Sequence, residues 1–171
     1  MEATPSLTFR FSAADNGAYQ LQLDAGQGDS PSAPFTPPYD RDTWRAIAQG
    51  LEPGFEPIRA DAATRKRLKE LGYPGNLHQT AGAALTEALL AAPEIRAAFD
   101  AALDAAESGR RTLPVDLRFD PGCDALAALP WELLHHRGRF LLSDTTIALS
   151  RCPEGAGAPT EVQAELPLRL L

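Results

Sequence analysis

A histidine and a cysteine in this chain have a spacing compatible with a nucleophilic His-Cys pair, since Cys123 follows His78 by 45 positions. Such a pair works because a neutral imidazole accepts the thiol proton and leaves a thiolate. The flanking residues favour a plainer reading. His78 lies between a Gly-Asn turn and a helix start, and Cys123 follows Pro121-Gly122 in a context that matches no nucleophile motif. We expect a helix-start histidine and a turn cysteine, with the active site kept as the alternative.

Two adjacent histidines, His135 and His136, could join Cys123 or Cys152 as zinc ligands. Adjacent side chains on a helix or strand point apart, and neither thiol has a second cysteine within the usual ligand spacing. We therefore expect no metal and no other cofactor. The histidines are expected at the end of a helix, where positive charge is favourable. The sequence also has no serine-nucleophile elbow, no glycine-rich phosphate loop after a strand and no carboxylate cluster with cation-ligand spacing.

The composition is typical of a soluble globular domain. The 171 residues carry a net charge of −7 at pH 7, with 44% hydrophobic and 23% charged residues. This acidity disfavours a nucleic-acid partner, and the densest basic run, Arg65-Lys66-Arg67 with Lys69, is expected on a solvated helix face. No segment approaches the ~20 apolar residues of a membrane helix, and the first residues lack a signal-peptide pattern. We expect a cytoplasmic protein without a membrane partner, whose two cysteines remain thiols.

The elements that would position these residues begin with a β-hairpin. Apolar and polar residues alternate over 7–11 and 18–23, and Asn16-Gly17 between them is a tight-turn signal. Residues 25–38 are rich in Gly, Ser and Pro and predict a loop. Four helical patterns follow. The first is predicted to start after a capping aspartate, Asp40 or Asp42, and the second after the capping residue Asp61. The third starts at Thr80, and Pro93 opens the fourth as a separate helix.

A strand and a short helix are predicted after these helices. Leu113 to Phe119 alternate apolar and polar residues, and Asp120-Pro121-Gly122 stops the strand. A helical stripe from Asp124 is interrupted by Pro130. The later part of the segment predicts a polar turn at 137–139 and two short strands over 140–142 and 145–149.

The centre of this segment is Pro130-Trp131-Glu132. An indole and a carboxylate beside a proline are costly to bury, so their placement indicates a specific role. The structural interpretation places Trp131 in the core against Phe119 and Phe140, with Glu132 bound to a backbone group or to Arg151. The functional interpretation is that they brace a boundary with another domain. We favour the structural role, because a buried carboxylate tends to be paired and tryptophan contributes a large apolar surface.

The run Leu126-Ala127-Ala128-Leu129-Pro130-Trp131-Glu132-Leu133-Leu134 resembles the opening half of the CHAT family of caspase-like cysteine peptidases. In that family an "LPWE(L/F)L" motif is followed by a "FL(A/S)" and "(V/I)xLxR" pair, which resembles Phe140–Ser143 and Ile147–Arg151 here. A linker and a "PLRxL" strand then open the peptidase core, which resembles residues 166–171. The resemblance is specific over residues 113–152 and upstream concerns the layout alone.

The resemblance implies a mixed α+β fold whose strand–helix–strand part packs as a caspase-like supporting half. Residues 1–152 would form one domain, 153–165 a Pro/Gly/Ala linker, and 166–171 the first strand of a peptidase core. The family's catalytic His and Cys lie beyond that strand, so no catalytic residue is carried over. The motif and interface residues are then Leu129, Pro130, Trp131, Glu132, Leu133 and Arg151.

The resemblance therefore predicts a non-catalytic, regulatory portion of a CHAT-type protease. It would brace the peptidase core and substrate groove, and it would relay activation from a sensor or repeat-protein partner, as in regulated bacterial proteolysis or defence. The alternative is a free-standing interaction module that binds and regulates a peptidase or sensor protein. The apolar residues 166–171 separate the two hypotheses, because an exposed apolar strand would favour aggregation of a free module.

Overall fold

The chain has an α+β fold, described here from a computed structural model that places residues 6–14, 17–26, 30–143 and 145–153. The helical elements are α1 (Arg41–Leu51), η1 (Pro57–Arg59), α2 (Ala62–Glu70), α3 (Leu77–Leu89), α4 (Pro93–Gly109), α5 (Asp124–Ala127) and η2 (Trp131–Leu133). The strands are β1 (Leu7–Ala13), β2 (Tyr19–Asp24), β3 (Ser32–Phe35), β4 (Leu113–Phe119), β5 (His135–His136), β6 (Arg139–Phe140) and β7 (Ile147–Pro153).

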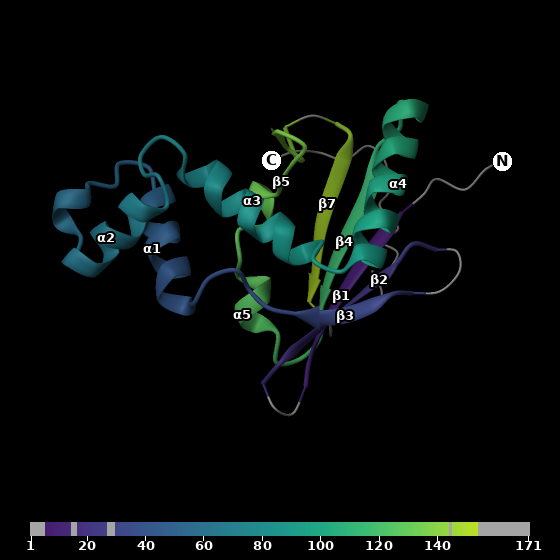
Figure 1. The fold of residues 1–171 in the computed structure, drawn as a ribbon, viewed down its shortest axis with the longest axis horizontal. Helices are drawn as coiled ribbons and strands as arrows, with labels where there is room; N and C mark the ends of the chain where they lie inside the picture. Colours follow the sequence, from purple (N-terminus) through teal and green to yellow (C-terminus); the bar gives the residue numbers. More distant parts are fainter. Residues whose placement is uncertain (1–5, 15–16, 27–29, 144, 154–171) are drawn as a thin grey trace, which may run out of the picture.

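Five strands form one mixed sheet in the order β3-β2-β1-β4-β7 (Figure 1). β1 and β2 are the antiparallel hairpin predicted from the sequence, with Phe9 opposite Leu23. β4 pairs parallel with β1 on one side and with β7 on the other, and Leu117 is the Cα partner of both Phe9 and Arg151. β1 and β7, which are far apart in the sequence, therefore lie on either side of β4.

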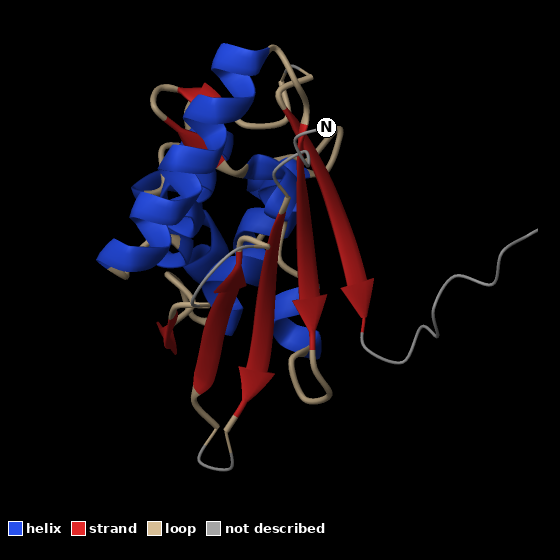
Figure 2. Ribbon diagram, turned by 90° about the vertical axis from the view of Figure 1, so that its right-hand side faces the viewer, coloured by secondary structure: helices blue, strands red, loops and turns tan. Residues whose placement is uncertain are grey.

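One face of the sheet is buried and the other is polar. Phe9 is fully buried and its ring lies 6.2 Å from that of Phe99 on α4, so α4 covers this face. Figure 2 shows the helices on one side of the sheet only. The opposite face exposes Arg10 and Arg118, which are register partners on β1 and β4. Apolar residues of these strands therefore face the helices, and the polar residues that alternate with them face the opposite side of the sheet.

A second hydrophobic cluster lies in the helical part formed by α1, α2 and the start of α3. Its buried members are Ala46, Ile47, Leu68, Leu71, Leu77 and Ala81. The two helices that open it are capped as predicted, because the Asp40 and Asp61 carboxylates accept from the amides of Thr43 and Thr64 at 2.7 and 2.8 Å. Trp44 packs against both clusters and so joins the helical part to the sheet.

Two predictions about strands are wrong. The predicted loop over 25–38 contains β3, which pairs with the open edge of β2, and Phe35 at its end is buried. The strands expected over 140–142 and 145–149 do not pair with each other. β6 pairs with β5 around the turn at Arg137-Gly138, and β7 pairs with β4 instead. Residues 154–165 of the expected linker and the expected strand 166–171 lie outside the described residues.

Candidate functional site

The Pro-Trp-Glu segment lies where the sheet meets the helices. After β4 the chain turns at Gly122, whose φ of 89° suits glycine, and passes through α5 into η2. Pro130 follows α5 as predicted, since it has no amide hydrogen with which to continue the helix. Trp131, Glu132 and Leu133 form the single turn of η2, so their side chains point in three different directions.

Trp131 is fully buried at the end of the sheet. Its ring centroid lies 5.3 Å from that of Phe11 and 6.0 Å from that of Phe119, and its indole N–H donates to the carbonyl of Leu126 at 2.8 Å. The expected contact with Phe119 is confirmed. The expected contact with Phe140 is replaced by Phe11, because Phe140 belongs to the small hairpin and packs on His135 at 5.1 Å. Trp131 therefore fixes α5 and η2 to β1 and β4.

Helix α3 approaches this segment closely at Gly82. A Cβ built on Gly82 would overlap the carbonyl oxygen of Leu133, so only glycine fits here without a shift of the backbone. One turn further along α3, the buried hydroxyl of Thr86 accepts from the amide of His135 at 3.0 Å and donates to the carbonyl of Gly82 at 2.9 Å. These contacts set the position of η2 relative to α3.

Glu132 and Arg151 form an ion pair, which is one of the two partners expected for this carboxylate. The expectation of a buried carboxylate is wrong, because the Glu132 side chain is 57% exposed. The guanidinium of Arg151 also donates to the carbonyl of Ala127 at 3.2 Å. Arg151 therefore contacts the chain on both sides of Pro130-Trp131 and joins this segment to the edge strand β7.

A pocket of about 460 Å³ opens beside Glu132. His78 lies at its border, at the exposed start of α3, together with Ser143. The Ser143 hydroxyl donates to the carbonyl of Phe140 at 2.7 Å. The remaining lining residues are Gly75, Gln79, Leu133, Phe140 and Leu142.

Cys123 has the environment of a structural thiol. It is fully buried, and its Sγ lies 3.5 Å from the carbonyl oxygen of Phe11 on β1. Burial, with a smaller effect of the carboxylates of Asp120 and Asp124, raises the pKa of the Cys123 thiol. Such a thiol resists the ionisation that a nucleophile needs. Cys123 does not border the pocket that His78 lines, so the structure does not bring the proposed pair together there.

The expected helix-end position of the two histidines is wrong, because they form strand β5. Their side chains point apart, as adjacent residues on a strand do. The imidazole of His136 lies 2.8 Å from the Asp100 carboxylate on α4 and 5.7 Å from the ring of Phe99, whereas His135 packs on Phe140. Within the described ranges no group of three or more His, Cys, Asp or Glu residues is arranged to hold a metal ion.

The sequence reasoning missed Gly82 and Thr86, although each carries a signal. A glycine inside a helical pattern costs about 1 kcal/mol relative to alanine and usually marks a close approach. A threonine on the apolar face of a helix indicates a buried hydroxyl that needs partners. Neither signal identifies Leu133 or His135 as the group on the other side.

None of the helices in the described part of the chain is long and apolar enough to cross a membrane. The chain was also compared with protein-family models, with curated proteins and with solved structures, and no family model, curated protein or solved structure matches it.

Proposed function

We propose that this chain is the supporting, regulatory portion of a CHAT-type, caspase-like protease, and that the catalytic dyad lies outside it. The observation that carries the proposal is the position of Arg151. This residue lies on the edge strand and contacts both Glu132 and the Ala127 carbonyl, so the motif that resembles the family is joined to the sheet edge. A displacement of that edge would therefore move the residues on both sides of Trp131, which Arg151 contacts.

The two edges of the sheet differ in a way that supports this role. β3 is four residues long and contains Pro34, which has no amide hydrogen, so it offers little for another strand to pair with. β7 spans seven residues, and no other strand in the described ranges pairs with its outer edge. An edge of this length is suited to the addition of a further strand. We propose that a peptidase core docks there.

The remaining parts of the proposal rest on the resemblance alone. The core partner would follow in the same chain or be supplied by another, and a sensor or repeat protein would provide the activating signal. Regulated proteolysis in a bacterial cytoplasm fits the two free cysteines, of which one is buried and one half-buried. A free-standing interaction module is the second candidate, and the same open edge of β7 favours it where the core belongs to another protein.

The native product from the host organism tests the proposal. An antibody to residues 30–143 would capture it after the lysate is treated with an affinity probe for cysteine-peptidase active sites, and intact mass would be measured. We expect a species well above 18.3 kDa, or a co-purifying fragment, with the probe on a cysteine outside this sequence. An unlabelled product of the present mass without a peptidase partner would contradict the protease role. Labelling of Cys123 itself would support the internal dyad.

A further inference from the structure

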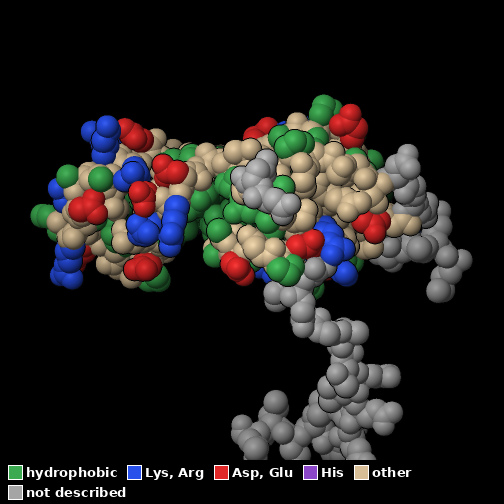
Figure 3. All heavy atoms as spheres, turned by 90° about the horizontal axis from the view of Figure 1, so that it is seen from below, with side chains coloured by type: hydrophobic (Ala, Val, Ile, Leu, Met, Phe, Trp, Pro, Cys, Tyr) green, Lys and Arg blue, Asp and Glu red, His purple; other side chains and the backbone are tan. Residues whose placement is uncertain are grey.

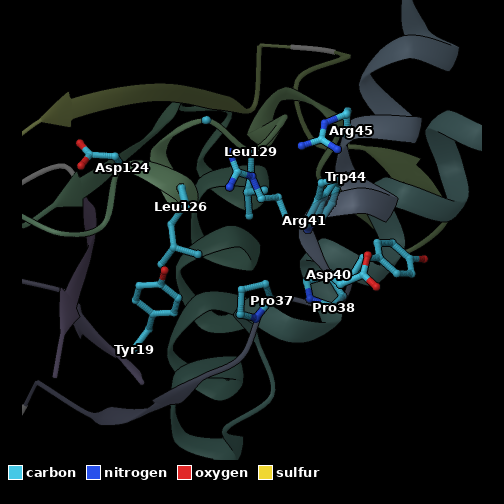
Figure 4. A pocket seen from close by; sticks show the side chains of 13 residues that line it. Tyr19, Pro37, Pro38, Asp40, Arg41, Trp44, Arg45, Asp124, Leu126 and Leu129 are labelled. Carbon is cyan, nitrogen blue, oxygen red and sulfur yellow. The ribbon is translucent and has the colours of Figure 1, made fainter. Parts of the chain in front are cut away.

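A large pocket opens between the helical part and the sheet. Its volume is about 980 Å³, within the range of small-molecule sites, which also tend to lie where two parts of a fold meet. Seen from below, hydrophobic side chains gather in the hollow between the two parts of the molecule (Figure 3). The residues that carry the argument are Tyr19, Arg41, Trp44, Asp124 and Leu129 (Figure 4).

The floor and walls of this pocket are apolar and aromatic. Tyr19 comes from β2, Trp44 from α1, and Leu126 and Leu129 from the segment around α5. Pro37 and Pro38 close the wall between β3 and α1. Rings and prolines contributed by separate elements form a rigid apolar surface, and such a surface favours an aromatic or branched aliphatic group.

Arg41 supplies a free positive charge at this surface. Its guanidinium makes no ion pair or hydrogen bond with any part of the chain that the structure describes, whereas the neighbouring Arg45 pairs with Asp42 at 2.9 Å. The carboxylate of Asp40, which also lines the pocket, accepts from the Thr43 amide at 2.7 Å and makes no ion pair with Arg41 among the described residues. Figure 4 shows Asp124 on the far side of the pocket from Arg41. The charge at the Arg41 side is therefore available to an anion.

Trp44 adds a donor without an acceptor. Its indole nitrogen is buried and has no hydrogen-bond partner among the described residues. The same side chain borders both the large pocket and a smaller one of about 340 Å³, which Ala128 and Leu129 also line. Most buried donors in proteins are paired, so this unpaired donor is an exception in the wall that the two pockets share.

We propose that this pocket binds a small carboxylate with an aromatic or branched aliphatic body, such as an N-acylated amino acid or the C-terminal residue of a peptide. The body packs on Tyr19, Trp44 and Leu129, and the carboxylate pairs with Arg41. This inference is independent of the proposed protease role. A ligand in this pocket would contact Leu129, which directly precedes Pro130-Trp131 in the sequence.

Binding is measured on the full chain by NMR, from the indole N–H signals of Trp44 and Trp131. Trp131 serves as a partial reference, because its N–H is already bonded to Leu126. The probes are N-acetyl-L-phenylalanine, its C-terminal amide and acetate. We expect N-acetyl-L-phenylalanine to shift the Trp44 signal with a Kd on the order of 1 mM, and the amide and acetate to bind at least about fivefold more weakly. A Trp44→Phe variant assigns the signal.

Two matched variants separate the charge at the pocket from general electrostatics. Arg41→Gln should weaken binding of N-acetyl-L-phenylalanine about fivefold or more, whereas Arg45→Gln, which removes a charge already paired with Asp42, should change it less than about twofold. The tripeptide acetyl-Ala-Ala-Phe distinguishes whether the natural ligand is a peptide C-terminus or a free acid. Tighter binding than the single residue supports a peptide C-terminus, and equal binding supports a free acid. Equal affinity for acid and amide, or no shift at about 10 mM, would overturn the proposal.

Discussion

Gly82 on α3 and Leu133 in η2 meet backbone to backbone, because the Leu133 carbonyl oxygen occupies the space that a Cβ on Gly82 would need. The contact links a helix whose start belongs to the helical cluster with the segment that carries Trp131 and Glu132. It also explains why a glycine is placed in the middle of a helix. The position of the candidate site therefore depends on a residue that contributes no side chain to it.

Gly82→Ala should destabilise the chain by about 2–4 kcal/mol, because α3 or η2 must move to make room for the added methyl group. The free energy of unfolding in urea measures the effect. Gly109→Ala is the matched control. Gly109 is also helical and a Cβ there would meet only the Arg111 side chain at 3.6 Å, so alanine should be neutral or stabilise by up to about 1 kcal/mol. Equal effects of the two changes would contradict the close contact.

Thr86→Val should cost about 1–3 kcal/mol, because it keeps the shape of the buried side chain but leaves the His135 amide without its acceptor. Thr86→Ser retains the hydroxyl and should lose less. Hydrogen exchange of the His135 amide is the local readout. It should accelerate in Thr86→Val and stay close to wild type in Thr86→Ser. Unchanged exchange in the valine variant would mean that another group satisfies this amide.

The two tryptophans should respond differently to the same substitution. Trp131→Phe removes a fully buried indole and its hydrogen bond to Leu126, so we expect a loss of about 2–4 kcal/mol. Trp44→Phe removes an indole donor that has no acceptor in the described structure and should cost less than about 1.5 kcal/mol. Thermal unfolding of both variants gives the comparison. A larger loss for Trp44→Phe would show that its N–H is bonded in solution.

The Glu132–Arg151 pair should contribute little to the stability of this chain alone. Both side chains are partly exposed, at 57% and 33%, and a double-mutant cycle with Glu132→Gln and Arg151→Gln should give a coupling of about 0.2–1 kcal/mol. The coupling should fall in about 1 M salt. A coupling that is far larger, and that salt does not reduce, would indicate that the pair is buried in solution by an assembly.

Cys123 should make the chain less stable at high pH. The pKa of its thiol is raised in the folded state by burial, so the folded chain retains a proton that the unfolded chain loses above the ordinary pKa of a thiol. Stability is therefore unaffected below that pH and falls as pH rises from there toward the folded-state pKa. Cys123→Ser should flatten this part of the profile. A parallel decline in both proteins would assign the effect to other groups.

The elements that the sequence predicted well have local signals. The first turns of α1 and α2 follow capping aspartates, and Pro93 opens α4 because it suits the first helical position. The β1–β2 hairpin combines alternation with the tight-turn signal of Asn16-Gly17 in the sequence. Each of these features is decided by residues within a few positions of one another, so one sequence is enough to find them.

The elements that it missed depend on distant partners. β3 is a short strand with a proline at the sheet edge, and its composition is that of a loop until the exposed edge of β2 is known. β7 has the pattern of a hairpin strand, and only the tertiary structure shows that it pairs parallel with β4. For the site, the ion pair of Glu132 with Arg151 was foreseen as one of two partners. Gly82 and the pocket around Trp44 require the packing of α1 and α3.

The strand order also sets the order in which this sheet can be completed during synthesis. β1 gains its hairpin partner β2 almost at once, but Val115, the β4 partner of Leu7, is translated more than a hundred residues later. The hairpin that bears the apolar side chains of Phe9 and Phe11 is therefore synthesised well before α4 and β4, which bury these side chains in the folded chain. Until those two elements are made, the apolar face of the N-terminal hairpin has neither the β4 strand to pair with nor the α4 helix to cover it.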